Sequence, residues 1–334
     1  MSEKIAIIGS GSWGTALAQV LADNNHDVLV WGRNMSEVVD IRDYHKNTLY
    51  FNDLILNENI KASINIESIK GYDYILLAVP TAAVESICEE LNYVLDAPVT
   101  IINVAKGFHP TTHQLLSDVI KTTVEAKYLK AVVSLIGPSH AENVVLRQHT
   151  AVNSVSDNEQ AAKDVQFMFS NDYFRVYRTT DVIGAQIGVA IKNIIAVASG
   201  IAEGLNLGDN ARAALITRGL AEMSRFGVSH GGLPETFIGL CGVGDLVVTA
   251  SSFHSRNFQA GLQIGEEDSA KRFLETNTKT VEGIHAAKVV HELSIEENIS
   301  MPITEQVYKI VYENKKPSLA IEELMMRDLK QESI

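Results

Sequence analysis

Residues 5–14 read Ile-Ala-Ile-Ile-Gly-Ser-Gly-Ser-Trp-Gly, an apolar run followed at once by three glycines spaced Gly-x-Gly-x-x-Gly. A helical pattern and a second apolar run, 27–31, come next. In this order Gly9 permits a tight turn, Gly11 lets a pyrophosphate approach the backbone, and Gly14 lets helix and strand pack closely. The start of the helix supplies unpaired N–H donors for the phosphates. The stretch predicts a dinucleotide-binding domain, the alternative being a glycine-rich turn without a ligand.

The residues after the second apolar run bear on which dinucleotide binds. They read Trp31-Gly-Arg33-Asn34 and include no Asp or Glu, the residue that usually accepts the ribose 2′-hydroxyl of NAD. Arg33 is suited to the 2′-phosphate of NADP instead, although an exposed arginine after a strand gives the same sequence. We therefore expect NADP or NAD as the cofactor, with NADPH accepted at least as well as NADH.

Three further apolar runs, 74–79, 99–104 and 132–136, continue the pattern of a parallel sheet. Ligands of such sheets bind beyond the carboxyl ends of the strands. Lys106 follows the second of these runs, and Gly-Pro-Ser-His-Ala at 137–141 follows the third. Both positions are therefore candidates for a ligand site.

A single charged side chain, Lys192, interrupts the apolar stretch 182–202. It shares a helical face with small residues, and no carboxylate lies three or four positions away to pair with it. Its ammonium group either reaches water along an apolar surface or is buried with a lowered pKa that suits proton transfer. The stretch is long enough to cross a bilayer, but Gln186, Lys192 and Asn193 favour a buried helix of a soluble protein. The small residues on this face are Gly184, Gly188, Ala196, Ser199 and Gly200.

The 334 residues are enough for two domains, and a helical period dominates from Asp181 onward. We expect an α/β, Rossmann-like dinucleotide-binding domain over 1–181. An all-α substrate and catalytic domain is expected over 182–334, with a cleft between the two.

Two charged residues of the second half are candidates for the same site. Asp245 lies in the glycine-rich stretch 239–249 and is either an ordinary helix N-cap or a hydrogen-bond partner of Lys192. Arg256 is suited to a planar, bidentate contact with an anion, although an arginine at a helix start is common.

Composition narrows the class of protein. The formal net charge of −13 argues against general nucleic-acid binding and leaves any anionic ligand dependent on a local cluster of cations. Two cysteines, Cys88 and Cys241, are too few for a disulfide framework and suit a reducing cytoplasm. No secretion signal and no metal-ligand spacing are recognisable.

Over nearly its whole length the chain resembles bacterial NAD(P)-dependent glycerol-3-phosphate dehydrogenases. The resemblance implies hydride transfer between NAD(P)H and dihydroxyacetone phosphate, giving sn-glycerol 3-phosphate for glycerophospholipid synthesis. The segments that carry it are Gly9–Ala18, Ala105–Gly107, Gly137–Glu142, Ala190–Ala196, Gly208–Glu222, Gly242–Leu246, Ser255–Asn257 and Val281–Gly283.

The resemblance also implies a role for individual residues. Lys192 is then the proton donor and acceptor. The implied substrate-binding residues are Lys106, Gly137, Ser139, Lys192, Asn193, Asp245, Thr249, Ser255, Arg256 and Asn257. The implied cofactor-binding residues, with the fingerprint glycines, are Gly9, Gly11, Ser12, Trp13, Gly14, Arg33, Asn34, Tyr50, Lys106, Ala141, Arg256, Thr280 and Glu282.

The sequence departs from the family pattern at a few positions, and two other functions remain as alternatives. The family often has Tyr-Leu-Pro where this chain has Tyr50-Phe-Asn52, and often a second basic residue in place of Asn34. One rival is a β-hydroxyacid-type dehydrogenase, which Asn193 directly after Lys192 disfavours. The other is an NAD(P)-binding sensor without turnover. The helical second half suggests a homodimer.

Overall fold

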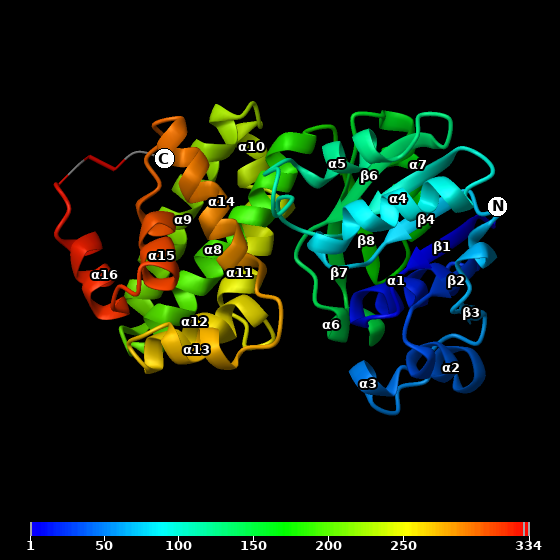
Figure 1. Cartoon of the computed structure of the whole chain (residues 1–334), viewed down its shortest axis with the longest axis horizontal. Helices are drawn as coiled ribbons and strands as arrows, with labels where there is room; N and C mark the ends of the chain where they lie inside the picture. The colour runs from blue at the N-terminus through cyan, green and yellow to red at the C-terminus, as the bar shows by residue number, and fades with distance from the viewer. Residues whose placement is uncertain (1, 330, 333–334) are drawn as a thin grey trace. The chain divides into compact units, whose positions relative to one another are not determined.

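The computed structural model describes residues 2–329 and 331–332. Contacts between Cα atoms divide the chain into two compact units (Figure 1). The first comprises Met1–Ala105 and Gln114–Val182, and the second comprises Lys106–His113 and Ile183–Ile334. The division thus falls at Val182, and the short segment with Lys106 belongs to the second unit although it follows a strand of the first.

The first unit is built on an eight-stranded sheet in the order β3-β2-β1-β4-β5-β6-β7-β8. Strands β1 to β6 run parallel to one another, β7 pairs antiparallel with β6, and β8 pairs parallel with β7. The strands are β1 (Lys4–Ile8), β2 (Asp27–Trp31), β3 (Ile60–Ser63), β4 (Tyr74–Leu77), β5 (Val99–Asn103), β6 (Leu129–Ile136), β7 (Thr150–Val155) and β8 (Phe174–Thr179).

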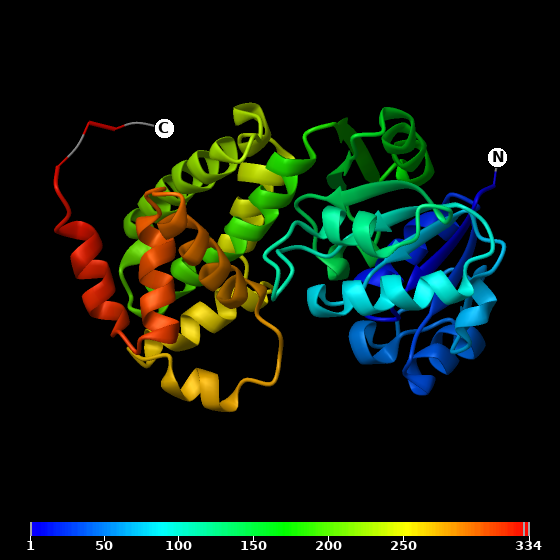
Figure 2. The same cartoon turned by 45° about the horizontal axis from the view of Figure 1, so that its top comes forward.

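Helices cover both faces of this sheet (Figure 2). The side chains of its buried strands accordingly alternate between two cores. Ile5 and Ile7 of β1 face a core with α1, α2, α6 and α7, whereas Ala6 and Ile8 face a core with α4 and α5. The predicted Rossmann-like fold is confirmed. The helices of this unit are α1 (Ser12–Asp23), α2 (Met35–Tyr44), α3 (Thr48–Phe51), α4 (Val84–Val94), α5 (Leu116–Thr123), α6 (Ala141–Val145) and α7 (Glu159–Phe169), with 3₁₀ turns η1 (Ile66–Ile69) and η2 (Thr81–Ala83).

The sheet order reverses at β1, which has β2 on one side and β4 on the other. Ile8 is in register with Trp31 and with Leu77, so the carboxyl ends of these three strands lie at one edge. Such a switch point is where dinucleotides bind to doubly wound sheets.

In its described part, the second unit consists of helices, as predicted. Within the glycine-rich stretch 239–249, a short π-type segment, η3, leads directly into α11, and Gly242 lies outside helical geometry. The elements are α8 (Val182–Gly204), α9 (Gly208–Ser229), α10 (Pro234–Phe237), η3 (Leu240–Gly244), α11 (Asp245–Ala250), α12 (Arg256–Glu266), α13 (Lys271–Thr276), α14 (Glu282–Glu296), α15 (Pro302–Tyr312) and α16 (Pro317–Met325).

Helix α8 is the core of this unit. It is long and apolar enough to cross a membrane, but 89% of its most apolar window is buried inside the protein. The prediction of a buried helix rather than a membrane span is therefore confirmed.

Helices α8 and α12 approach each other at backbone distance. A Cβ atom on Gly200 of α8 would lie 2.1 Å from the Phe258 carbonyl oxygen, and one on Gly261 of α12 would lie 2.0 Å from that of Val197. Real Cβ atoms do not approach backbone so closely, so only glycine fits at these crossings. This contact explains part of the small-residue face on α8.

We predict that Gly261→Ala destabilises the fold by at least about 2 kcal/mol, because the methyl group forces α12 away from α8. In an uncrowded helix the same change would instead stabilise the protein by up to about 1 kcal/mol. Urea unfolding monitored by circular dichroism measures the change, with Gln263→Ala on the same helix as the control. Unchanged or increased stability of the Gly261 variant would contradict this packing.

Candidate functional site

The fingerprint loop follows β1 in the first unit. Gly9 has φ +122°, and a Cβ there would lie 2.4 Å from the Ala78 carbonyl oxygen, whereas a Cβ on Gly14 would lie 2.1 Å from the carbonyl oxygen of Gly9. Packing within the protein therefore accounts for these two glycines. Gly11 differs, because a Cβ there would meet no atom within 4 Å. Close approach of a ligand accounts for a glycine at that position, so the loop fits a pyrophosphate.

A buried asparagine holds the loop in place. The Asn47 Nδ2 atom donates to the Ser10 carbonyl oxygen and to the Thr15 Oγ1 atom, both at 2.8 Å. The Ser10 carbonyl is thereby turned into the protein. No local signal in the sequence points to Asn47, because it lies 37 positions from Ser10.

The other predicted cofactor residues of the first unit lie on several elements. Ser12 and Trp13 open α1, Arg33 is exposed just beyond β2, and Tyr50 lies in the short α3. Ala141 is the buried first residue of α6. The side chain of Asn34 is already engaged as the N-cap of α2, where its Oδ1 atom accepts from the Ser36 backbone N–H at 3.0 Å.

The turn after β6 contains two of the predicted substrate residues. Gly137 packs so closely that a Cβ there would lie 2.9 Å from the Val152 Cα atom. The Ser139 hydroxyl donates to the Gly137 carbonyl oxygen at 3.2 Å, closing the turn. Both residues belong to the first unit, and their contact with a substrate stays a prediction.

In the second unit, two lysines share one aspartate. The Lys192 Nζ atom donates to Asp245 Oδ1 and to the Thr249 hydroxyl oxygen, both at 2.6 Å. The Lys106 Nζ atom lies 2.9 Å from the other oxygen, Asp245 Oδ2. Lys192 is 4% exposed and Asp245 is 1% exposed. Lys192 therefore does not reach water along an apolar surface, and Asp245 is its partner rather than a helix cap.

The path of the chain explains how this cluster forms. Asp245 is the first residue of α11, and Thr249 is one turn later on the same face, where its hydroxyl donates to the Asp245 carbonyl oxygen at 2.6 Å. At the end of α11, the Ala250 carbonyl accepts from the Ser199 hydroxyl of α8 at 2.8 Å. The small side chain at Ser199 thus anchors α11 beside Lys192.

Burial and charge set the protonation of the cluster. Burial, with help from the charge of Lys106, lowers the pKa of Lys192 to about 8, although Asp245 opposes the shift. Burial also acts to lower the pKa of Lys106, but the charge and hydrogen bond of Asp245 outweigh it and raise that pKa. Burial would raise the pKa of Asp245, but the two lysines lower it. Lys192 is therefore the cation of the pair that gives up its proton more readily.

A network of amide groups connects α8, α12 and α14 in the same unit. The Asn257 Nδ2 atom donates to Asn193 Oδ1 at 3.0 Å, and the Asn193 Nδ2 atom donates to Glu282 Oε2 at 3.2 Å. The Gly283 backbone N–H donates to Asn257 Oδ1 at 2.9 Å. These hydrogen bonds orient Asn193 and Asn257, which are both predicted to bind the substrate. They also place the carboxylate of Glu282 beside Asn193.

The start of α12 adds the remaining predicted residues. The Ser255 hydroxyl accepts from the Phe258 backbone N–H at 3.2 Å and caps the helix, and Arg256 is its exposed first residue. Burial raises the pKa of Glu282, while the charges of Arg256 and Lys106 act to lower it. Thr280 is exposed two residues before α14 begins, and it takes no part in the hydrogen bonds described above for the lysines and asparagines.

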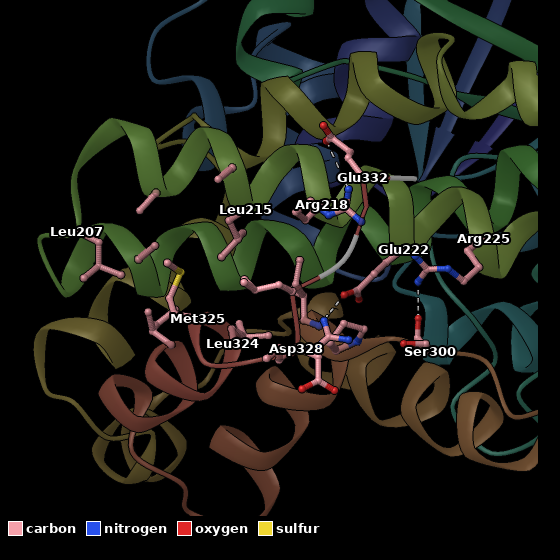
Figure 3. A pocket seen from close by; sticks show the side chains of 18 of the residues that line it. Leu207, Leu215, Arg218, Glu222, Arg225, Ser300, Leu324, Met325, Asp328 and Glu332 are labelled. Atoms are coloured by element: carbon pink, nitrogen blue, oxygen red, sulfur yellow. Dashed lines mark hydrogen bonds and ion pairs between the residues drawn. The ribbon is translucent and has the colours of Figure 1, made fainter. Parts of the chain in front are cut away.

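The second unit also contains a cavity of about 500 Å³ between α9 and α16, whose lining does not include the lysine cluster (Figure 3). Glu222 at its edge accepts from the Ile303 and Thr304 backbone N–H groups at 2.7 and 3.2 Å, capping α15. Burial raises the pKa of Glu222 to about 7. Arg225 donates to the Ser300 carbonyl oxygen beside it. These contacts give Glu222 a structural role, because they join α9 to the start of α15.

His230 packs at the end of α9. It stacks on Phe226 at 4.2 Å between ring centroids, and its Nε2 atom lies 3.3 Å from Glu297. It ends α9 and has no contact with the lysine cluster among the described interactions.

The dinucleotide-binding sheet and the buried, paired lysine define a dinucleotide-dependent dehydrogenase with a helical second domain. The chain belongs to the family of NAD-dependent glycerol-3-phosphate dehydrogenases. The family's N-terminal model matches residues 4–162, and its C-terminal model matches residues 181–322.

Individual relatives agree with this assignment. The chain is 46% identical over 330 residues to glycerol-3-phosphate dehydrogenase (NAD(P)+) of Listeria monocytogenes, covering 98% of this chain and 97% of the relative. It is 44% identical over 329 residues to the enzyme of the same name from an Exiguobacterium species, covering 98% and 96%. The crystal structure of glycerol-3-phosphate dehydrogenase from Coxiella burnetii matches with a TM-score of 0.90 at 37% identity, covering 98% of this chain and 99% of that one.

Proposed function

We propose that this chain interconverts dihydroxyacetone phosphate and sn-glycerol 3-phosphate with NAD(P)H, and that Lys192 transfers the proton. The observation that carries the proposal is a lysine buried at 4% exposure, paired with Asp245, in a member of this dehydrogenase family. The dinucleotide fingerprint and the family's N-terminal model support the cofactor class.

The proton chemistry follows from the lysine cluster. When bound, the nicotinamide supplies the hydride to the carbonyl carbon in the reduction. Lys192 as ammonium donates a hydrogen bond and then a proton to the carbonyl oxygen, and neutral Lys192 accepts the hydroxyl proton in the reverse direction. Asp245 and Thr249 fix the direction of the Nζ atom, and a pKa of about 8 lets both protonation states exist near neutral pH.

The phosphate of the substrate requires cations in a chain of net charge −13. Lys106 and Arg256 are the proposed charged contacts, with Asn257 as a neutral donor. Binding of the phosphate, remote from the reacting carbon, then orients the carbonyl. The contacts proposed for the rest of the substrate are Gly137, Ser139, Asn193, Thr249 and Ser255.

For the cofactor, we propose that the fingerprint loop binds the pyrophosphate and that NADPH is accepted at least as well as NADH. Arg33, exposed at the carboxyl end of β2, supports a contact with the 2′-phosphate. Contacts with the cofactor are also proposed for Ser12, Trp13, Asn34, Tyr50, Lys106, Ala141, Arg256, Thr280 and Glu282.

The proposal also covers the cellular role of the protein. We propose that it is a cytoplasmic homodimer and that its product, sn-glycerol 3-phosphate, is used for glycerophospholipid synthesis. Both cysteines are buried, and the two do not form a disulfide, which suits a reducing compartment.

The two rival functions have weaker support. Both family models of NAD-dependent glycerol-3-phosphate dehydrogenases match the chain, and Asn193 directly after Lys192 disfavours a β-hydroxyacid-type dehydrogenase. A sensor without turnover has no need to bury a lysine and lower its pKa, since burial of an ammonium group costs several kcal/mol.

We predict that Lys192→Met lowers kcat for dihydroxyacetone phosphate by about 10²–10⁴-fold, the range typical of general acid–base catalysis. The fold should survive, because Asp245 keeps Lys106 as a partner. NADPH affinity, measured by direct titration, should change much less, because the fingerprint loop is untouched.

Lys288→Met serves as the control for this experiment, because Lys288 is half exposed on α14. It should retain normal turnover. Near-normal turnover of the Lys192 variant would remove Lys192 as the proton donor, and absence of turnover in the wild-type protein with any phosphorylated 2-oxo substrate would favour the sensor.

We predict opposite pH profiles for the two directions of the reaction. Neutral Lys192 is needed for oxidation, so kcat/KM for sn-glycerol 3-phosphate should rise with pH through a midpoint near 8. Protonated Lys192 is needed for reduction, so kcat/KM for dihydroxyacetone phosphate should fall through the same midpoint. A midpoint near the ordinary lysine value of 10.5 would show that Lys192 is not the titrating group.

A further inference from the structure

The first unit contains a carboxylate beside the glycine fingerprint, although the three residues that follow β2 include no Asp or Glu. The Ser10 hydroxyl, within the glycine fingerprint, donates to Glu37 Oε2 at 2.5 Å. Ser10 is 5% exposed, and Glu37 is half-buried in the first turn of α2. A carboxylate therefore lies against the loop that faces the dinucleotide, although no Asp or Glu follows β2 directly.

A glycine at the end of β2 permits this contact. A Cβ on Gly32 would lie 2.3 Å from the Ser10 Oγ atom, so any other residue would push the two loops apart. The backbone of Ser10 is fixed from the other side by Asn47, which donates to its carbonyl oxygen at 2.8 Å. Ser10 is thereby held with its hydroxyl directed at Glu37.

The other oxygen of the carboxylate is oriented by the helix cap. The Asn34 Nδ2 atom donates to Glu37 Oε1 at 2.9 Å, in the spacing of a capping box. Each carboxylate oxygen has two lone pairs, so one hydrogen bond to each leaves capacity for further donors. The group is thus fixed in direction and still able to accept hydrogen bonds from a ligand.

We propose that Glu37 accepts the ribose hydroxyls of the adenosine half of NADH and disfavours the 2′-phosphate of NADPH, in opposition to Arg33. The inference rests on the proposed dinucleotide function. In doubly wound sheets the adenosine ribose lies beside the carboxyl end of the second strand, where a carboxylate usually accepts its 2′-hydroxyl. Glu37 supplies that group from the helix, six residues after Trp31, the last residue of β2.

The alternative is that Glu37 only caps α2. A purely structural role predicts that its removal affects NADH and NADPH alike, because the loop would loosen for both. A role in selection predicts opposite effects, because a 2′-hydroxyl donates to a carboxylate whereas a phosphate dianion is repelled by it. The two roles are therefore separable by comparing the two cofactors.

The test is direct titration of the full-length protein with NADH and with NADPH, in the absence of substrate, for the wild type and Glu37→Gln. Glutamine keeps the size of the side chain and removes its charge. We expect the dissociation constant for NADH to rise about tenfold, since a hydrogen bond to a charged group is lost, and that for NADPH to fall. Asp43→Asn, which removes the same charge from the exposed end of α2, should shift the ratio by less than about twofold.

Equal changes for both cofactors, or none, in Glu37→Gln would overturn the inference while leaving the dehydrogenase function intact. Failure of the wild-type protein to bind either cofactor would overturn both. If Glu37→Gln does not fold, Glu37→Asp makes the same test, because it withdraws the carboxylate by one methylene group. Its selectivity should then move toward NADPH, and an unchanged ratio would overturn the inference.

Discussion

The contact between Lys192 and Asp245 is the interaction on which the geometry of the lysine cluster depends. An ammonium group buried in a helical core costs several kcal/mol unless it is paired and hydrogen-bonded. Asp245 provides the pairing, and the Thr249 hydroxyl provides a second acceptor, both at 2.6 Å. Lys106 on the other carboxylate oxygen makes the cluster cationic, so it attracts an anionic substrate although the whole chain is acidic.

The small-residue face of α8 makes that contact possible. Gly188 lies so near η3 that a Cβ there would be 2.7 Å from the Cys241 carbonyl oxygen. Gly200 likewise admits the backbone of α12, and Ser199 bonds to the end of α11. Larger residues would hold both helices away from Lys192. The small residues that share a helical face with Lys192 therefore form a packing surface for η3, α11 and α12. These three elements together position Asp245 and Asn257.

Much of this arrangement could be predicted from the sequence, because its signals are local. The glycine fingerprint after an apolar run indicated the sheet, and one lysine in an apolar stretch indicated the buried cluster. The strands β3, β7 and β8 were not predicted. β3 has only four residues, and exposed residues such as Arg175 and Tyr177 interrupt the apolar pattern of the edge strand β8.

The parts that escaped prediction depend on contacts between distant segments. Glu37 was missed because the expected acid directly follows a strand, whereas here a helix returns it to Ser10. Asn47 reaches the same loop from 37 positions away. Lys106 groups with the helical unit and donates to Asp245, 139 positions later, and no spacing in the sequence indicates this contact.

The most direct test of the account is the pH dependence of sn-glycerol 3-phosphate oxidation by Asp245→Asn. Burial and Lys106 both lower the pKa of Lys192, and Asp245 is the main group that raises it. Replacing the carboxylate by a neutral amide of the same shape should move the midpoint of kcat/KM at least about one pH unit below that of the wild type. Intact folding of the variant is verified by circular dichroism. A midpoint that stays near 8 would contradict the claim that the Lys192–Asp245 contact controls proton transfer.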